Sequence, residues 1–148
     1  MKKIILVICS ILVLSANALA GDHNAAEVDV LAKTSLSWDG QALPDYPRGA
    51  PEITILRIKV APGAKLPMHE HPVINAGVLL AGELTVVTEN NETLHLKAGD
   101  AIVEVVEKWH YGMNEGSTPA EIVVFYAGAA GRPVTVSKRD SAPAKMSN

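Results

Sequence analysis

The stretch Gly63-Ala64-Lys65-Leu66-Pro67-Met68-His69-Glu70-His71 places two histidines two positions apart in a segment with extended character. On a β-strand, residues i and i+2 point to the same face, so both imidazoles can reach a single ion. Imidazole ligands suit Zn, Cu, Fe or Ni better than Mg or Ca. The alternative is a polar strand face that binds nothing, and this stretch alone does not separate the two interpretations.

A second patterned stretch carries a third histidine. It begins at Gly99-Asp100, passes through His110 and ends at Asn114. In the first stretch, the His-x-His pair is followed by Gly82. Three neutral imidazoles from two separate strands would leave coordination positions open for water or substrate, as in catalytic metal sites.

These two stretches resemble the two motifs of the cupin superfamily over roughly residues 52–136. Among its members, the chain resembles most the small exported single-domain cupins of the cupin type 2 kind. The resemblance implies an all-β fold, a double-stranded β-helix (jelly roll) closed into a single barrel. It also implies one divalent transition metal ion (Fe, Mn, Ni, Zn or Cu) at the barrel mouth, held by His69, His71 and His110.

Two positions depart from the family pattern. Asn75 stands where the pattern has a ligand glutamate, and Val105-Val106-Glu107 replaces a Pro-x-Gly. Asn75 has the same parity as the two histidines of the first stretch, and its side-chain oxygen is a neutral, weaker donor than a carboxylate. We therefore place Asn75 in the metal site, either as a ligand or as a hydrogen-bonding partner of a metal-bound water or a histidine.

Glu104 is the candidate catalytic residue. On a strand over residues 101–106, Ile102, Glu104 and Val106 share one face, which the resemblance places inside the barrel. A carboxylate there is costly to bury unless it is paired or bound to metal. Two orientations are open. Glu104 faces the cavity and acts as a replacement ligand or general base, or the strand is shifted by one residue and Glu104 faces solvent.

Short β-patterned runs fill the chain from residue 52 onward, and no amphipathic helical run interrupts them. Such spacing predicts a sandwich or barrel. The predicted strands cover residues 53–60, 78–88 with a break at Gly82, 93–96, 101–106, 122–126 and 134–136. Residues 21–51 are expected to form an arm, in which Trp38 and Tyr46 either face a substrate or anchor the arm. Residues 137–148 are expected to form a flexible tail, and residues 52–136 the barrel.

Residues 1–20 have the pattern of a cleaved signal peptide. Lys2-Lys3 precede an apolar run, and Ala18-Leu19-Ala20 forms a small-residue cleavage site. The run is too short for a membrane span, so the expected location is periplasmic or secreted, without membrane association after cleavage. Cleavage removes the single cysteine and shifts the net charge from −3 to −5 (two lysines lost). An acidic chain without basic runs is a poor nucleic-acid partner.

The leading functional hypothesis is an exported cupin whose metal acts on a small organic ligand by dioxygenase-, isomerase- or lyase-like chemistry. The alternative is a cupin module that binds a small molecule or a metal without turnover. The resemblance also implies a homodimer formed through the arm. Neither a phosphate-binding glycine loop nor a Ser-His-Asp frame is present, which leaves the metal as the source of chemistry.

Overall fold

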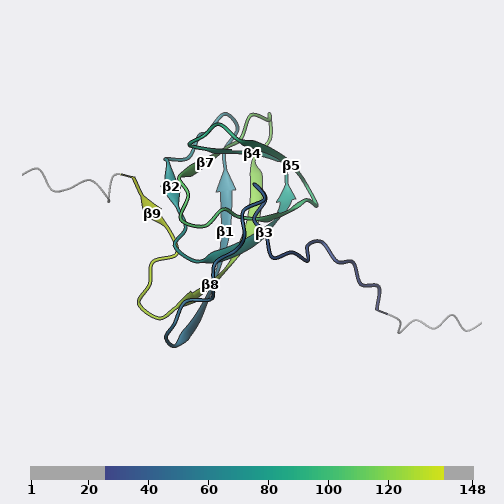
Figure 1. Ribbon diagram of the computed structural model, residues 1–148. Coiled ribbons are helices and arrows are strands. Elements are labelled where there is room, and N and C mark those ends of the chain that lie inside the picture. Colours follow the sequence, from purple (N-terminus) through teal and green to yellow (C-terminus); the bar gives the residue numbers. More distant parts are fainter. Residues whose placement is uncertain (1–25, 139–148) are drawn as a thin grey trace, which may run out of the picture.

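Two antiparallel β-sheets pack face to face in the computed structural model, which describes residues 26–138 (Figure 1). The first sheet has the strand order β1 (Pro51–Val60), β8 (Ala120–Ala129), β3 (Ile74–Ala81), β6 (Ala101–Val103). The second has the order β5 (Thr93–Lys97), β4 (Glu83–Thr88), β7 (His110–Met113), β2 (His69–Glu70), β9 (Val136–Ser137). The predicted all-β jelly roll is confirmed. Over these residues no helix is long and apolar enough to cross a membrane.

Alternation along β8 explains why this strand joins the core. Ile122, Val124 and Tyr126 are buried. On the other face, Glu121 is half-buried and Phe125 is exposed. Strand side chains alternate between faces, so an apolar residue at every second position builds one buried face. β8 therefore lies at the centre of its sheet, paired with β1 on one side and β3 on the other.

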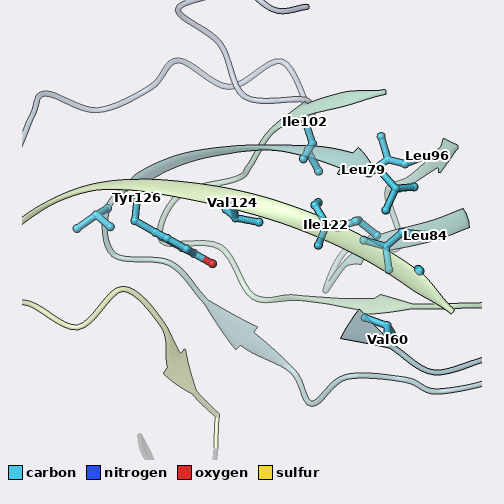
Figure 2. Close-up of a cluster of buried hydrophobic side chains, with 11 residues drawn as sticks. Val60, Leu79, Leu84, Leu96, Ile102, Ile122, Val124 and Tyr126 are labelled. Atoms are coloured by element: carbon cyan, nitrogen blue, oxygen red, sulfur yellow. The ribbon is translucent and has the colours of Figure 1, made fainter. Parts of the chain in front are cut away.

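The core lies between the two sheets (Figure 2). Its side chains are almost all aliphatic, and each buried Val, Leu or Ile contributes about 1.5–3 kcal/mol. The cluster consists of Val60, Val73, Leu79, Leu84, Val86, Leu96, Ile102, Ala120, Ile122, Val124 and Tyr126. Tyr126 lies at one end of this cluster and Leu84 at the other.

The strand boundaries differ from the predicted ones at several ends. β1 and β8 are longer than predicted, and the last strand lies at 136–137 rather than 134–136. The predicted strand 101–106 ends at Val103, because the chain then bends around Glu107, whose φ is 53° and whose N–H donates to the carbonyl of His71. This bend brings the loop before β7 beside the histidines.

Trp38 attaches the segment that precedes β1 to the barrel. Its backbone N–H donates to the carbonyl of Val103 over 2.9 Å, and its ring packs against the core cluster. Tyr46, by contrast, is 74% exposed. Of the two roles predicted for these residues, facing a substrate or anchoring the arm, Trp38 has the second. Tyr46 is neither packed against the core cluster nor part of the lining of the main cavity.

Gly82, at the β3–β4 junction, is expected to tolerate no other residue. Its φ is +72°, and a Cβ there would lie 2.6 Å from the carbonyl oxygen of Pro119 and 2.9 Å from Cα of Ala120. Gly82→Ala should lower the free energy of unfolding by about 3 kcal/mol or more, because strain and a backbone clash add. Gly63 has the same φ of +72° with no atom within 4 Å, so Gly63→Ala should cost only about 1 kcal/mol. Denaturant unfolding measures the free energy of unfolding of both variants. Equal losses in Gly82→Ala and Gly63→Ala would contradict the backbone clash at Gly82.

Candidate metal centre

Three histidines converge although they come from different segments. His69 lies on β2 and His110 on β7, directly opposite each other in the pairing of the two strands, and His71 follows β2. The ring centroids are 4.5 to 5.0 Å apart, and one ligand atom from each residue lies within 4.8 Å of the others. The structure thus brings together the three residues that the motifs singled out.

Each imidazole is oriented by a backbone carbonyl. The Nδ1 atoms of His69, His71 and His110 lie 2.8 Å from the carbonyl oxygens of Pro67, Val134 and Lys108, respectively. A carbonyl oxygen only accepts, so each Nδ1 carries the proton and donates it. The lone pair is then on Nε2 in all three rings, which is the arrangement that a metal ligand requires.

Burial keeps two of the three rings neutral. Desolvation, followed by the charge of His110, lowers the pKa of His71 to about 3. Desolvation lowers the pKa of His110 to about 4. Both rings are therefore neutral at pH 7 and need not lose a proton before they bind an ion.

Glu104 faces the cavity, which decides between the two orientations considered for it. Its side chain is buried, its backbone N–H donates to the carbonyl of Asn75, and its Oε2 lies 3.6 Å from Nε2 of His110. Burial raises the pKa of Glu104 to about 7. A carboxyl with this pKa both holds and releases a proton near neutral pH, as a general acid or base must.

Several buried polar atoms at this place have no hydrogen-bond partner. Among the described residues, these atoms are Nε2 of His110, Oε2 of Glu104, Oδ1 of Asn75 and, away from the site, Nε1 of Trp38. Unpaired buried polar atoms are uncommon in proteins and call for an explanation such as an ion. One nitrogen and two oxygen donors of this kind fit a transition metal ion.

Asn75 lies beside the site but does not line the cavity. It is 2% exposed on β3, and its Nδ2 makes one long hydrogen bond of 3.4 Å to the carbonyl of Val73. Its position is adjacent to Glu104 through the backbone hydrogen bond between the two residues. The structure thus pairs Asn75 with Glu104, and a role of Asn75 in the metal site stays a prediction.

Tyr126 and Thr135 were missed by the sequence analysis. The ring of Tyr126 packs against His71 with 5.3 Å between centroids, and burial, followed by the charge of Glu104, raises its pKa to about 12. Oγ1 of Thr135 lies 3.3 Å from Nδ1 of His71. The alternation Ile122, Val124, Tyr126 was a usable signal for the tyrosine; no pattern marked the threonine.

A cavity of about 300 Å³ opens beside the three histidines. Its polar lining comes from the histidines, Glu104, Tyr126, Thr135 and Ser137. The rest is apolar: Leu56, Ile58, Val60, Leu66, Pro67, Leu84, Val86, Gly112, Ile122 and Val124. A polar cluster at an otherwise apolar cavity is typical of small-molecule sites.

Lys108 connects the histidine loop to two other parts of the chain. Its Nζ donates to Oδ2 of Asp39 over 2.8 Å and to Oε2 of Glu92, and its carbonyl accepts from His110. The Lys108 side chain is 19% exposed and that of Asp39 is 1% exposed, so this pairing is partly shielded from water. Lys108 is therefore a positioning residue for His110.

Removing the Lys108 ammonium is expected to weaken metal binding. Lys108→Met frees the loop that presents the carbonyl to His110, and the loss of such an orienting contact lowers metal affinity about 10-fold. Lys97→Met, at an exposed position of β5, is the control and should leave affinity unchanged. Competition against a chromophoric chelator measures both. Equal metal affinity of Lys108→Met and Lys97→Met would show that Lys108 does not position His110.

The family model described as "Cupin domain" matches residues 56–126. The chain belongs to the cupin superfamily. This match contains His69, His71, Asn75, Glu104 and His110.

Two relatives of this cupin are germin-like or oxidase proteins. Germin-like protein subfamily 1 member 7 of Arabidopsis thaliana is 32% identical over 97 residues, which cover 60% of this chain and 42% of that protein. A solved oxalate oxidase in complex with the substrate analogue glycolate is 28% identical, with a TM-score of 0.51, over 58% of this chain and 46% of the other. The cupin therefore spans less than half the length of either relative.

A further solved structure shares the fold over most of its own length. An uncharacterized double-stranded β-helix protein from Klebsiella pneumoniae aligns with a TM-score of 0.51 and 24% identity, covering 62% of this cupin and 84% of that chain. At this identity the similarity concerns the fold alone.

Asn114 and Gly63, the outer residues of the two cupin motifs, have a structural role here. The N–H of Gly63 donates to the carbonyl of Asn114, and Nδ2 of Asn114 donates to the carbonyls of Val60 and Thr118. These bonds join the chain before β2 to the end of β7. The motif spacing therefore reflects how the histidine segments are held together.

Proposed function

We propose that this cupin binds one divalent transition metal ion through Nε2 of His69, His71 and His110 and converts a small organic molecule in the adjoining cavity. The observation that carries the proposal is the shared hydrogen-bond pattern, in which each Nδ1 donates to a carbonyl and leaves Nε2 as the ligand atom. Asn75 is proposed as a further oxygen donor, to the ion or to a metal-bound water, since its Oδ1 is buried without a partner.

Glu104 is the proposed catalytic residue. The ion, when bound, supplies Lewis-acid polarisation or oxygen activation. Oε2 of Glu104, 3.6 Å from Nε2 of His110, holds or moves a proton at the substrate atom next to the ion. Tyr126 positions the substrate from the cavity wall, and the aliphatic lining excludes water. Dioxygenase-, isomerase- and lyase-like reactions are all compatible with these roles.

An oxidase among the relatives supports turnover over simple binding. The solved relative at 28% identity is named an oxalate oxidase, and its alignment covers 58% of this chain. The position of Glu104 is a second argument, because a buried carboxyl that lines a cavity next to a metal ligand is typical of catalytic sites.

An exchangeable coordination position distinguishes the enzyme from a binding module. The protein loaded with Cu(II) should give an EPR spectrum that changes when azide is added, since three protein nitrogens leave room for a further ligand. An unchanged spectrum would indicate a closed site and favour the module that binds without turnover.

We also propose that the chain is exported to the periplasm or the outside of the cell and forms a homodimer. The signal pattern lies in residues 1–20, outside the described residues. Three large apolar side chains on the outer face of the first sheet support the dimer: Ile53, Ile55 and Phe125 are 65%, 57% and 50% exposed. N-terminal sequencing of the exported protein and its mass by light scattering test the two proposals.

A further inference from the structure

The cavity beside the histidines has a polar end and an aliphatic remainder, and this asymmetry indicates what it holds. The polar groups come from the histidines, Glu104, Tyr126, Thr135 and Ser137, whereas β1, β4 and β8 supply aliphatic side chains such as Ile58, Val86 and Val124. A ligand that fills this space therefore meets hydrogen-bonding and coordinating atoms on one side only. The rest of its surface contacts hydrocarbon.

No lysine or arginine of residues 26–138 lines the cavity. Arg57, between Leu56 and Ile58 of the lining, points to the other face of β1 and pairs with Glu121 at 3.4 Å. Lys65 lies over the ring of Tyr111, 3.7 Å from its centroid. The cavity thus offers a carboxyl, Glu104, but no cation to pair with an anionic ligand beyond the charge of a bound ion.

Charge and size together limit the ligand. A divalent ion held by neutral imidazoles beside an ionised Glu104 leaves one net positive charge, which a monoanion neutralises and a dianion exceeds. A dianion would also leave carboxylate oxygens against aliphatic side chains, and burial of an unpaired charge is strongly unfavourable. The volume of about 300 Å³ equals that of about ten water molecules in the liquid, which accommodates roughly ten non-hydrogen atoms. A two-carbon dicarboxylate would leave much of the cavity unfilled.

We infer that the ligand class of this site is a neutral or singly charged organic molecule with an oxygen-donor head and an apolar body, and not a small dicarboxylate. The head binds at the histidine cluster, and the body lies between β1, β4 and β8. This inference rests on the proposed function, because the head is placed at the metal site. It also separates the chain from the oxalate oxidase that it resembles.

Three chelators of known structure test the inference on the Zn(II)-loaded protein by isothermal titration. Acetohydroxamate and hexanohydroxamate share a head and differ by four methylenes, and oxalate is the small dianion. Hexanohydroxamate should bind about 250-fold more tightly than acetohydroxamate, since each of the four buried methylenes strengthens binding about fourfold. Oxalate should bind more weakly than either. Ultrafiltration after each titration confirms that the ion stays with the protein.

Two leucine variants separate the contribution of the cavity lining to ligand binding from the contribution of the metal ion. Leu56, 36% exposed, lines the cavity, and Leu56→Lys places a cation there. This variant should bind oxalate about 10-fold more tightly and lose most of the preference for the longer hydroxamate. Leu80 is 49% exposed on β3 and does not line the cavity, so Leu80→Lys is the matched control and should behave as the unmodified protein. Equal melting temperatures establish that both variants fold.

The outcomes distinguish the inference from the proposed function. A preference for the longer hydroxamate that Leu56→Lys removes supports the inference. Tighter binding of oxalate than of hexanohydroxamate, or no gain from the longer chain, overturns the inference while the metal site stands. A protein that retains no Zn(II) overturns the proposed function, and the inference falls with it.

Discussion

Replacing His71 by alanine is expected to lower the affinity for a divalent transition metal ion by about 100-fold or more. The side chain supplies one of three Nε2 ligands, is 4% exposed and is held by the carbonyl of Val134. Metal–imidazole bonds provide a large share of the total binding free energy of such sites, so the loss of one of three ligands is severe. Competition titration against a chelator of known affinity measures the change.

His95→Ala is the matched control for this experiment. His95 is an exposed histidine of β5 whose Nδ1 lies 3.1 Å from Oγ1 of Thr85, and it is not part of the metal cluster. Its replacement should leave metal affinity within about twofold. A similar loss in both variants would mean that ions bind to exposed histidines rather than to a built site.

Glu104→Gln is expected to change how the stability of the metal-free protein depends on pH. Burial raises the pKa of Glu104 from 4.5 to about 7, so between these values the folded chain holds a proton that the unfolded chain has released. The free energy of unfolding should therefore fall as pH rises from 4.5 to about 7 and stay level above it. The total loss is about 3 kcal/mol. Glutamine has no such proton. The variant should therefore be more stable than the unmodified chain at pH 8, and the two proteins should have nearly the same free energy of unfolding at pH 4.5.

The histidines give a pH dependence of the opposite sign, which both proteins share. The lowered pKa values of His71 and His110 mean that the unfolded chain binds protons below pH 6.5 that the folded chain excludes, so stability falls as the solution becomes more acidic. The difference between the Glu104→Gln variant and the unmodified chain isolates the carboxyl.

Urea unfolding across pH measures this difference, with Glu107→Gln as the control. Glu107 is exposed and lies on the same loop, so its replacement should leave the profile unchanged. Parallel profiles for Glu104→Gln and the unmodified chain would show that Glu104 is not held in an unfavourable environment. In the loaded protein, the same variant should also lose most of any turnover, because glutamine carries no proton to transfer.

The histidine cluster was predictable because its residues have a spacing that a strand converts directly into geometry. His69 and His71 lie two apart, His110 lies in a separate motif, and the barrel brings the segments together as the resemblance implied. That prediction needs only local periodicity and two motif frames. The orientation of Glu104 was left open by the sequence, because a strand shifted by one residue would have turned the side chain to solvent; its burial in the structure decides for the cavity.

Contacts between distant parts of the chain were not predictable in the same way. The carbonyl of Val134 that orients His71 is 63 residues away in sequence, and Asp39 lies 69 residues from Lys108. Neither residue type nor spacing marks such a pair. The end of β6 at Val103 also escaped prediction, because the positive φ of Glu107 is a consequence of tertiary contacts rather than of its own preference.

The metal content of the purified protein tests the central claim most directly. Elemental analysis after dialysis is made on the unmodified chain and on the His69→Ala/His71→Ala variant, with equal melting behaviour as the check on folding. We expect close to one transition metal ion per chain in the unmodified protein and almost none in the variant. No ion under any loading condition, or the same content in both proteins, would contradict a metal centre built from these histidines.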